Sequence, residues 1–282
     1  MEIAFYNGEF IPKNEIRISP DDRGFLFADG IYEVVKWYGG SFFDIETHLF
    51  RLKRSLREIR LEWPENESFP DIATELVIKN GLSGKHAMIY LQVTRGAARR
   101  IHHFPDNDVP PTVYAFAKEL PDTGKNPVTG IGVIMKEDIR WKRCDIKSVS
   151  LLPNVMGNQE AREQGCKECV FIRNGFITEA SHSNVFFVIN GQVQTHPESD
   201  FILSGVTRKN VIRIASDMGI TVKEEPLHES ELENTDEVFI TNTTGEVTPV
   251  ITINGKQAGD GVPGKITSLL REKLLAEISA TL

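Results

Sequence analysis

The spacing of apolar residues along the chain predicts several amphipathic helices. Leu49, Leu52, Leu56 and Ile59 recur at helical spacing with arginines and lysines between them. Such a stripe is typical of a helix that packs one face on a core. Glycines that follow three of the other stripes are the usual C-terminal stop. Besides the helix around Leu52, we expect helices over residues 71–80, 154–164, 205–219 and 263–280.

Short apolar runs between these helices predict buried strands. They cover residues 87–93, 112–117, 130–135, 169–173, 185–189 and 238–241. Asn-Gly pairs at residues 7–8, 174–175, 190–191 and 254–255 separate apolar or alternating segments. This pair favours a two-residue hairpin turn, because both of its residues tolerate a positive φ. A further hairpin is expected from residues 31–37, the Gly39-Gly40 turn and residues 41–44.

A change of composition between Glu119 and Gly130 predicts a linker. This stretch holds two prolines and two glycines among polar neighbours, which is typical of a domain boundary. We therefore expect an α/β fold of the α+β type, with an N-terminal α/β domain over residues 1–120, a linker over 121–130 and a C-terminal domain over 131–282. Ligand pockets favour the seam between two such domains.

Composition and charge narrow the functional classes. The chain has 282 residues, 40% of them hydrophobic and 26% charged, and a net charge of -8. An acidic chain is a poor partner for nucleic acid, which normally requires a basic field. Neither a secretion signal at the N-terminus nor an apolar run long enough to span a membrane is expected. Three cysteines favour a reducing cytoplasm over a disulfide scaffold.

One lysine and one carboxylate together suggest a cofactor chemistry. Lys147 lies in the run Arg-Cys-Asp-Ile-Lys-Ser, and Glu179 follows about thirty residues later on an expected strand. Pyridoxal 5′-phosphate needs an amine to hold its aldehyde carbon. It also needs a carboxylate that keeps the pyridine nitrogen protonated, so that the ring accepts electrons. Taken alone, both residues could equally be solvated surface, which is the usual place of lysine and glutamate.

Two segments could hold a phosphate group. Residues 203–208, Leu-Ser-Gly-Val-Thr-Arg, lead into an expected helix, whose free N–H groups and dipole would face an anion. An ordinary helix start capped by Ser204 is the alternative. Residues 241–249 supply clustered hydroxyls and a glycine after a strand, although turns of this composition are common. Arg51 is another candidate for an anion, and its alternative is a solvated helix face.

The segment from Arg95 to Pro105 places an arginine and a histidine two residues apart, on one face if the chain is extended. An arginine fork with a histidine beside it suits a carboxylate; a solvated loop is the alternative. No metal site is expected. Adjacent His102 and His103 would point to opposite sides of a strand, and the Cys166-x-x-Cys169 pair is isolated. Residues 259–265 have the glycine spacing of a nucleotide loop, but Ile266 stands where a serine or threonine should hold magnesium.

These segments together resemble the fold-type IV pyridoxal phosphate enzymes, and within that family the D-amino-acid aminotransferases. The similarity covers nearly the whole chain. It is carried by the sequence runs Asp-Arg-Gly-Phe with Asp-Gly-Ile-Tyr-Glu, Val-Thr-Arg-Gly, Glu-Asp-Ile-Arg-Trp with Cys-Asp-Ile-Lys-Ser, and Thr-Thr-Gly-Glu-Val-Thr-Pro, at residues 22–25, 29–33, 93–96, 137–141, 144–148 and 243–249.

The resemblance implies a role for each matching residue. Lys147 would hold pyridoxal 5′-phosphate as an imine and later carry a proton, and Glu179 would bind the pyridine nitrogen. The phosphate group would be held by Arg51, Val206, Thr207, Thr243 and Thr244. The substrate carboxylate would be bound by Tyr32, Arg100 and His102, of which the arginine and histidine would come from the neighbouring subunit of a homodimer.

The resemblance also implies a fold, with a smaller N-terminal α/β domain and a larger C-terminal domain built on a mixed, barrel-like sheet. The expected reaction transfers the amino group of a D-amino acid such as D-alanine to a 2-oxo acid such as pyruvate or 2-oxoglutarate. Ala180 and His182 depart from the glycine and serine usual after the carboxylate, and Arg99 leaves open which arginine reaches the substrate. Alternatives are an L-branched-chain aminotransferase, an R-selective amine transaminase or a non-catalytic binder of a phosphorylated ligand.

Overall fold

A computed structural model describes residues 1–105, 108–122 and 129–282 of the chain, in two compact units. The first unit contains Met1–Asp122, Ile146–Ser150 and Thr281–Leu282. The second contains the described residues 129–145 and Leu151–Ala280. Most of the expected linker, residues 123–128, lies outside the described residues. Ile146–Ser150 belong to the first unit, whereas the sequence assigned them to the C-terminal domain.

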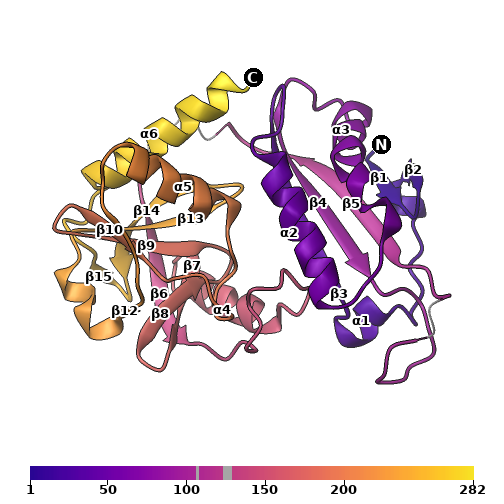
Figure 1. Cartoon of the computed structure of the whole chain (residues 1–282), viewed down its shortest axis with the longest axis horizontal. Helices are drawn as coiled ribbons and strands as arrows, with labels where there is room; N and C mark the ends of the chain where they lie inside the picture. The colour runs from indigo at the N-terminus through magenta and orange to yellow at the C-terminus, as the bar shows by residue number, and fades with distance from the viewer. Residues whose placement is uncertain (106–107, 123–128) are drawn as a thin grey trace. The chain divides into compact units, whose positions relative to one another are not determined.

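The first unit is an antiparallel sheet with two helices packed against it (Figure 1). The strand order is β2-β1-β5-β4-β3. The strands are β1 (Ile3–Tyr6), β2 (Glu9–Pro12), β3 (Gly30–Tyr38), β4 (His86–Thr94) and β5 (Thr112–Glu119). The helices are α1 (Arg23–Phe27), α2 (Ile45–Glu58) and α3 (Phe69–Lys79), with 3₁₀ turns η1 (Lys13–Glu15) and η2 (Pro64–Ser68). The expected hairpin at Asn7-Gly8 is confirmed, since β1 pairs with β2 around it.

The core of this unit lies between the sheet and helices α2 and α3. Leu49, Leu52 and Leu56 of α2 are buried against Ile31 and Val35 of β3, as the helical spacing predicted. Each fully buried leucine contributes about 2 kcal/mol through the apolar surface that it removes from water. One residue on this core-facing side of β3, Glu33, is charged and buried; it is described with the candidate site.

The second unit is built on a ring of strands. Its sheet runs β11-β10-β9-β13-β14-β6-β7-β8-β12, and an additional pairing of β8 with β9 closes the segment from β9 to β8 on itself. The ring strands are β6 (Ile131–Glu137), β7 (Glu168–Arg173), β8 (Phe176–Ala180), β9 (Asn184–Ile189), β13 (Glu237–Asn242) and β14 (Glu246–Ile253). Strands β14, β6 and β7 are parallel neighbours, and the other ring pairs are antiparallel. The expected barrel-like mixed sheet is thereby confirmed.

Apolar side chains fill the ring, among them Val133, Val185, Phe187 and Ile240. The unit also contains α4 (Leu152–Glu163), α5 (Val206–Asp217), α6 (Lys265–Ala280), the 3₁₀ turn η4 (Glu229–Asn234) and the short strands β10 (Gln192–Thr195), β11 (Val222–Glu224), β12 (Leu227–His228) and β15 (Lys256–Gln257). Helices α4, α5 and α6 agree with the spacing of apolar residues to within two or three residues.

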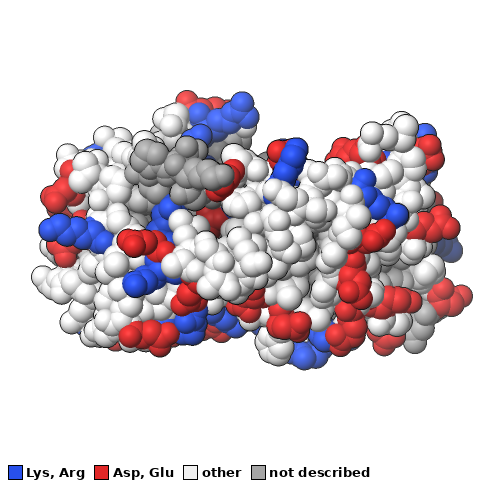
Figure 2. Space-filling view, turned by 90° about the horizontal axis from the view of Figure 1, so that it is seen from above, with Lys and Arg blue, Asp and Glu red and all other residues white. Residues whose placement is uncertain are grey.

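Acidic and basic side chains are interspersed on the face of the molecule in Figure 2 and gather into no broad basic field there. In the described ranges, the helices are too short or too polar to cross a bilayer. Cys144, Cys166 and Cys169 are free thiols.

Candidate active site

Lys147 lies in the first unit because its segment adds to the edge of β3. The N–H of Tyr32 donates to the Lys147 carbonyl at 2.9 Å, and the N–H of Val149 donates to the Gly30 carbonyl at 3.1 Å. The Lys147 ammonium nitrogen lies 4.2 Å from the centre of the Tyr32 ring. The structure therefore brings together the expected cofactor lysine and one of the expected substrate-binding residues.

Arg51 is part of a buried ion-pair cluster on the same unit. Its Nη2 lies 2.6 Å from Glu33 Oε1 and its Nε 3.0 Å from Oε2, while His48 Nδ1 lies 3.1 Å from Oε1. Glu33 is fully buried and Arg51 is only 7% exposed, so Arg51 does not lie on a solvated helix face. A fork-shaped guanidinium held by a carboxylate is fixed in orientation.

The charges of this cluster depend on one another. Burial raises the pKa of Glu33, but Arg51 and His48 outweigh it and hold that pKa well below its usual range. Burial lowers the pKa of His48, and the positive charges of Arg51 and Lys147 lower it further. Glu33 raises this pKa but does not outweigh them. Glu33 is therefore a permanent anion beneath Arg51 at neutral pH.

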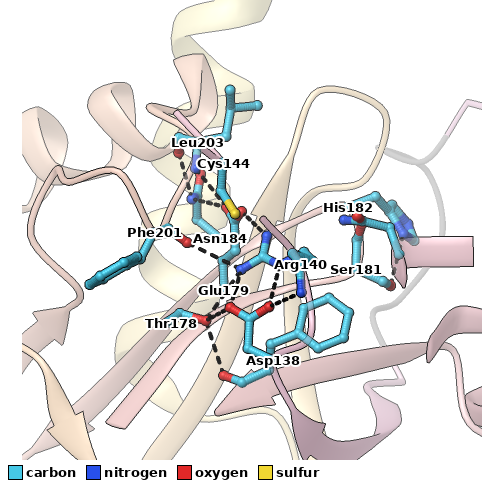
Figure 3. A network of polar contacts seen from close by, with 12 residues as sticks. Asp138, Arg140, Cys144, Thr178, Glu179, Ser181, His182, Asn184, Phe201 and Leu203 are labelled. Carbon is cyan, nitrogen blue, oxygen red and sulfur yellow. Dashed lines mark hydrogen bonds and ion pairs between the residues drawn. The ribbon is translucent and has the colours of Figure 1, made fainter. Parts of the chain in front are cut away.

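Glu179 lies in the second unit, at the point where the ring of strands closes. It pairs with Asn184 across β8 and β9. Its Oε2 accepts the Leu203 N–H at 2.9 Å and the Asn184 amide at 3.2 Å, and its Oε1 accepts Arg140 Nη1. Figure 3 shows Arg140 between the carboxylates of Glu179 and Asp138.

Burial raises the pKa of Glu179, and the attraction of Arg140 opposes that rise. The three groups directed at this carboxylate are all donors, so they match its ionised form, which only accepts hydrogen bonds. An ionised carboxylate at this position is what a protonated pyridine nitrogen requires.

Helix α5 begins without a side-chain cap. Gly205 is its N-cap residue, and within the described residues this helix start has no side-chain cap hydrogen bond. Ser204, the expected capping residue of the alternative interpretation, donates to Glu198 Oε1 at 2.6 Å instead. A Cβ on Gly205 would lie 2.1 Å from Asn184 Oδ1. The helix start at Val206 and Thr207 therefore has the free N–H groups and the close-packed glycine that a bound phosphate would require.

Thr243 and Thr244 lie in the turn between β13 and β14. Asn242 Oδ1 accepts the N–H of Thr244 at 3.0 Å and that of Gly245 at 2.6 Å, which fixes the turn. One strand residue before Asn242, the buried Thr241 hydroxyl has no hydrogen-bond partner among the described residues. Buried polar groups normally have a partner, so an orphan hydroxyl beside this turn is consistent with a polar ligand.

Arg100 and His102 lie on an exposed loop of the first unit. The guanidinium carbon of Arg100 is 5.1 Å from the centre of the Phe27 ring, and the His102 ring is 5.6 Å from the same centre. The two residues expected to bind a carboxylate therefore share one neighbour. Within the described residues, Arg99 has no ring contact, ion pair or hydrogen bond.

Sequence reasoning assigned no role to Glu33, Arg140 or Asn184. Glu33 had a usable signal, because it alternates with the apolar Ile31 and Val35 on the buried face of its strand. Arg140 and Asn184 had none, since their roles arise only when the ring closes.

On the first unit an amine lies beside a tyrosine, and on the second there are a buried carboxylate and a helix start without a side-chain cap. Each of these features is one that binding of pyridoxal 5′-phosphate requires. The chain belongs to the class IV aminotransferase family, whose sequence pattern matches residues 30–253. Enzymes of this fold type use pyridoxal 5′-phosphate, and one of the similar solved structures, a branched-chain amino acid aminotransferase, contains pyridoxamine 5′-phosphate. The expected family, fold class, cofactor and class of reaction are confirmed.

Curated relatives and solved structures agree with this family. The chain is 41% identical over 273 residues to D-alanine aminotransferase of Staphylococcus haemolyticus, covering 96% of both chains, and 38% identical over 284 residues to that of Bacillus licheniformis, covering 99% of both. The branched-chain aminotransferase of Thermoproteus uzoniensis with norvaline has a TM-score of 0.85 at 26% identity, with 96% and 93% of the two chains covered. The Escherichia coli branched-chain enzyme shares the fold, with a TM-score of 0.90 at 23% identity over 98% and 94%.

Proposed function

We propose that this chain is a D-amino-acid aminotransferase, which transfers the amino group of a D-amino acid such as D-alanine to a 2-oxo acid such as pyruvate or 2-oxoglutarate. The observation that carries the proposal is that Arg100 and His102 both lie near the ring of Phe27, in a chain 38–41% identical to D-alanine aminotransferases.

On each unit, taken by itself, there are residues of the kind that pyridoxal 5′-phosphate requires. Lys147 Nζ would bind its aldehyde carbon and Glu179 its pyridine nitrogen. Its phosphate group would be held by the start of α5 at Val206 and Thr207, the turn at Thr243 and Thr244, and the guanidinium of Arg51. When bound, the cofactor withdraws electrons from the substrate Cα and makes its proton acidic.

In this proposal Lys147 is also the group that moves the proton. Nζ of Lys147, as a free amine, would take the Cα proton of the substrate as a general base. The Tyr32 ring, 4.2 Å from Nζ, limits the positions open to that amine. Arg140 and Asn184 keep the Glu179 carboxylate in place throughout.

Substrate selection is assigned to the carboxylate-binding set. The Arg100 fork would hold the substrate carboxylate, with Tyr32 and His102 as further donors. Because Arg100 and His102 are exposed on their own unit, we propose that they complete the site of a second copy, so that the working enzyme is a homodimer. A cytoplasmic location is also proposed, supported by three cysteines that are all free thiols.

The test is an assay of the purified protein with D-alanine and with L-leucine, each against 2-oxoglutarate. We expect turnover with D-alanine and the corresponding oxo acid as product. Arg100→Ala should raise the KM for D-alanine by about tenfold or more, as loss of a charged hydrogen bond implies, whereas Arg99→Ala serves as the matched control with little effect. Turnover with L-leucine alone would favour a branched-chain aminotransferase.

A non-catalytic binder of a phosphorylated ligand is the other class of function. It would require neither a free amine at Lys147 nor a carboxylate at Glu179. Lys147→Ala should abolish turnover and the visible imine band of the cofactor-loaded protein. A colourless wild-type protein that stays colourless with added pyridoxal 5′-phosphate would support the binder instead.

A further inference from the structure

The loop that carries Arg100 and His102 is fastened to the segment before and within α1. The N–H of Arg23 donates to the Gly96 carbonyl at 2.9 Å, and the N–H of Ala98 donates to the Asp21 carbonyl at 3.2 Å. Farther along the loop, Arg23 Nη1 donates to the carbonyl of Ile101 at 2.7 Å. The residue between Arg100 and His102 is therefore tied by its backbone to α1.

The side chains of the pair meet α1 as well, at Phe27. The centre of the Phe27 ring lies 4.7 Å from the guanidinium carbon of Arg23, 5.1 Å from that of Arg100 and 5.6 Å from the ring of His102. A guanidinium over an aromatic face is attracted by the ring quadrupole. One ring thus contacts residues 100 and 102 together, and the side chain of Arg99 has no such neighbour in the described part of the chain.

Phe27 and Arg23 are themselves fixed in place. Arg23 is 2% exposed, and its Nε donates to Asp29 at 2.8 Å. Asp29 also accepts Arg95 Nε at 2.9 Å, and Arg95 stands at the start of the same loop. Helix α1 ends at Phe27, because Ala28 adopts the left-handed region at φ 54° and its N–H returns to the Gly24 carbonyl at 3.1 Å.

Phe104, farther along the loop, lies beside Arg95 at the start of the loop. The guanidinium carbon of Arg95 lies 3.7 Å from the centre of the Phe104 ring, and Arg60 approaches the same ring at 4.9 Å. Arg95 also donates to the carbonyls of Ile59 and Arg60 at 2.7 and 2.8 Å. Arg95, Ile101 and Phe104 are therefore each anchored, and Phe27 contacts the exposed side chains of Arg100 and His102.

We propose that Phe27 is a positioning residue for substrate recognition: its ring presets the side chains of Arg100 and His102 as a pair that receives the substrate carboxylate, and selects Arg100 over Arg99 for that role. This inference rests on the proposed function. Arginine is a long side chain with much rotamer freedom to lose, so a ring that restricts it before binding strengthens carboxylate binding without any contact with the substrate.

The experiment measures the first half-reaction of the cofactor-loaded enzyme by rapid mixing with increasing D-alanine, and the second half-reaction with pyruvate. Phe27→Leu keeps an apolar side chain but removes the ring. We expect the apparent Kd of both carboxylate substrates to rise about three- to tenfold, since the contacts of the ring with Arg100 and with His102 are lost. The limiting rates and the affinity for pyridoxal 5′-phosphate should change less than about twofold.

Two variants control for folding and for the helix. Phe27→Tyr retains the ring and should stay within about twofold of wild type. Phe25→Leu removes an aromatic side chain from the same helix that is 77% exposed and should also stay within about twofold. In a double-mutant cycle, Phe27→Leu should add little to Arg100→Gln, because Phe27 acts through that arginine.

A Phe27→Leu variant that matches Phe25→Leu would overturn the positioning role, as would effects of Phe27→Leu and Arg100→Gln that simply add. So would a loss of cofactor affinity in step with the loss of D-alanine affinity, which marks a general structural effect. If Arg100→Gln itself leaves both substrate affinities unchanged, the carboxylate assignment in the proposed function fails, and the positioning role fails with it. If Arg100→Gln weakens the binding of both substrates as expected and Phe27→Leu leaves it unchanged, only the positioning role is overturned.

Discussion

Replacing Glu33 by Gln tests the buried cluster that orients Arg51. The carboxylate is fully buried, and its two oxygens lie 2.6 and 3.0 Å from the guanidinium. Removing one charge of a buried pair costs about 3–5 kcal/mol, because the other charge stays buried without its partner. Gln keeps the shape and one acceptor, so we expect a loss of about 3 kcal/mol in the free energy of unfolding. Urea unfolding of the cofactor-free protein at pH 7 measures it.

The matched control is Glu75→Gln, which breaks the exposed pair with Lys79 at 3.0 Å on α3. Such pairs contribute about 0.5 kcal/mol or less. The pH dependence gives a second check. The pKa of Glu33 is depressed in the folded protein by Arg51 and His48, against burial, which raises it. A depressed carboxyl pKa stabilises the fold above the unfolded pKa of about 4.3, and this contribution is lost as the pH falls below it.

The difference in stability between wild type and Glu33→Gln should therefore be constant from about pH 7 to pH 5 and should shrink below about pH 4. The refuting results are a loss below about 1 kcal/mol at pH 7, equal to that of Glu75→Gln, or a difference that does not shrink in acid. Either would mean that Arg51 is oriented by something other than the Glu33 carboxylate.

Three further changes test the second unit. Gly205→Ala should lower the free energy of unfolding by about 1–3 kcal/mol and weaken retention of pyridoxal 5′-phosphate, because its Cβ would lie 2.1 Å from Asn184 Oδ1. Gly84→Ala is the control, since a Cβ there meets nothing within 4 Å. Equal unfolding midpoints for the two variants would contradict the expectation. Glu179→Gln should lower kcat about a hundredfold or more while the bound cofactor remains visible, and a near-normal kcat would remove Glu179 from its role. Thr241→Val should stabilise the cofactor-free protein by about 1 kcal/mol, since a buried hydroxyl without a partner is removed; a clear loss in thermal unfolding would show that the hydroxyl is already satisfied.

Local patterns predicted much of the fold. The spacing of Leu49, Leu52 and Leu56 predicted a helix with one face on a core, and the three leucines lie on α2 and are buried in the core. The Asn-Gly pairs at Asn7, Asn174, Asn190 and Asn254 each lie between paired strands, with the asparagine at a φ near 50°. These signals are local, so no knowledge of distant contacts was required.

Long-range pairing is what the sequence could not supply. Nothing near Lys147 indicates that its carbonyl accepts the N–H of Tyr32, which is why the sequence grouped its segment with the C-terminal residues. Likewise, closure of the ring depends on one pairing between Glu179 and Asn184. Helix α1 spans only Arg23–Phe27, too few residues for a helical period.

For two parts of the candidate site, the sequence left two interpretations open. Strand β14 begins at Glu246, inside a segment that composition favoured as a turn, and continues through Pro249 opposite Phe239. The choice between Arg99 and Arg100 also could not be made from spacing. It depends on Phe27, more than seventy residues earlier in the chain, which contacts only the second of the two arginines among the described residues.

The most direct test of the whole account is to reduce the cofactor-loaded protein with borohydride, digest it and map the modified peptide. The account predicts a single phosphopyridoxyl label, on the peptide that contains Lys147, and loss of that label when D-alanine is added before the reductant. A label on another lysine, or no label at all, would contradict it.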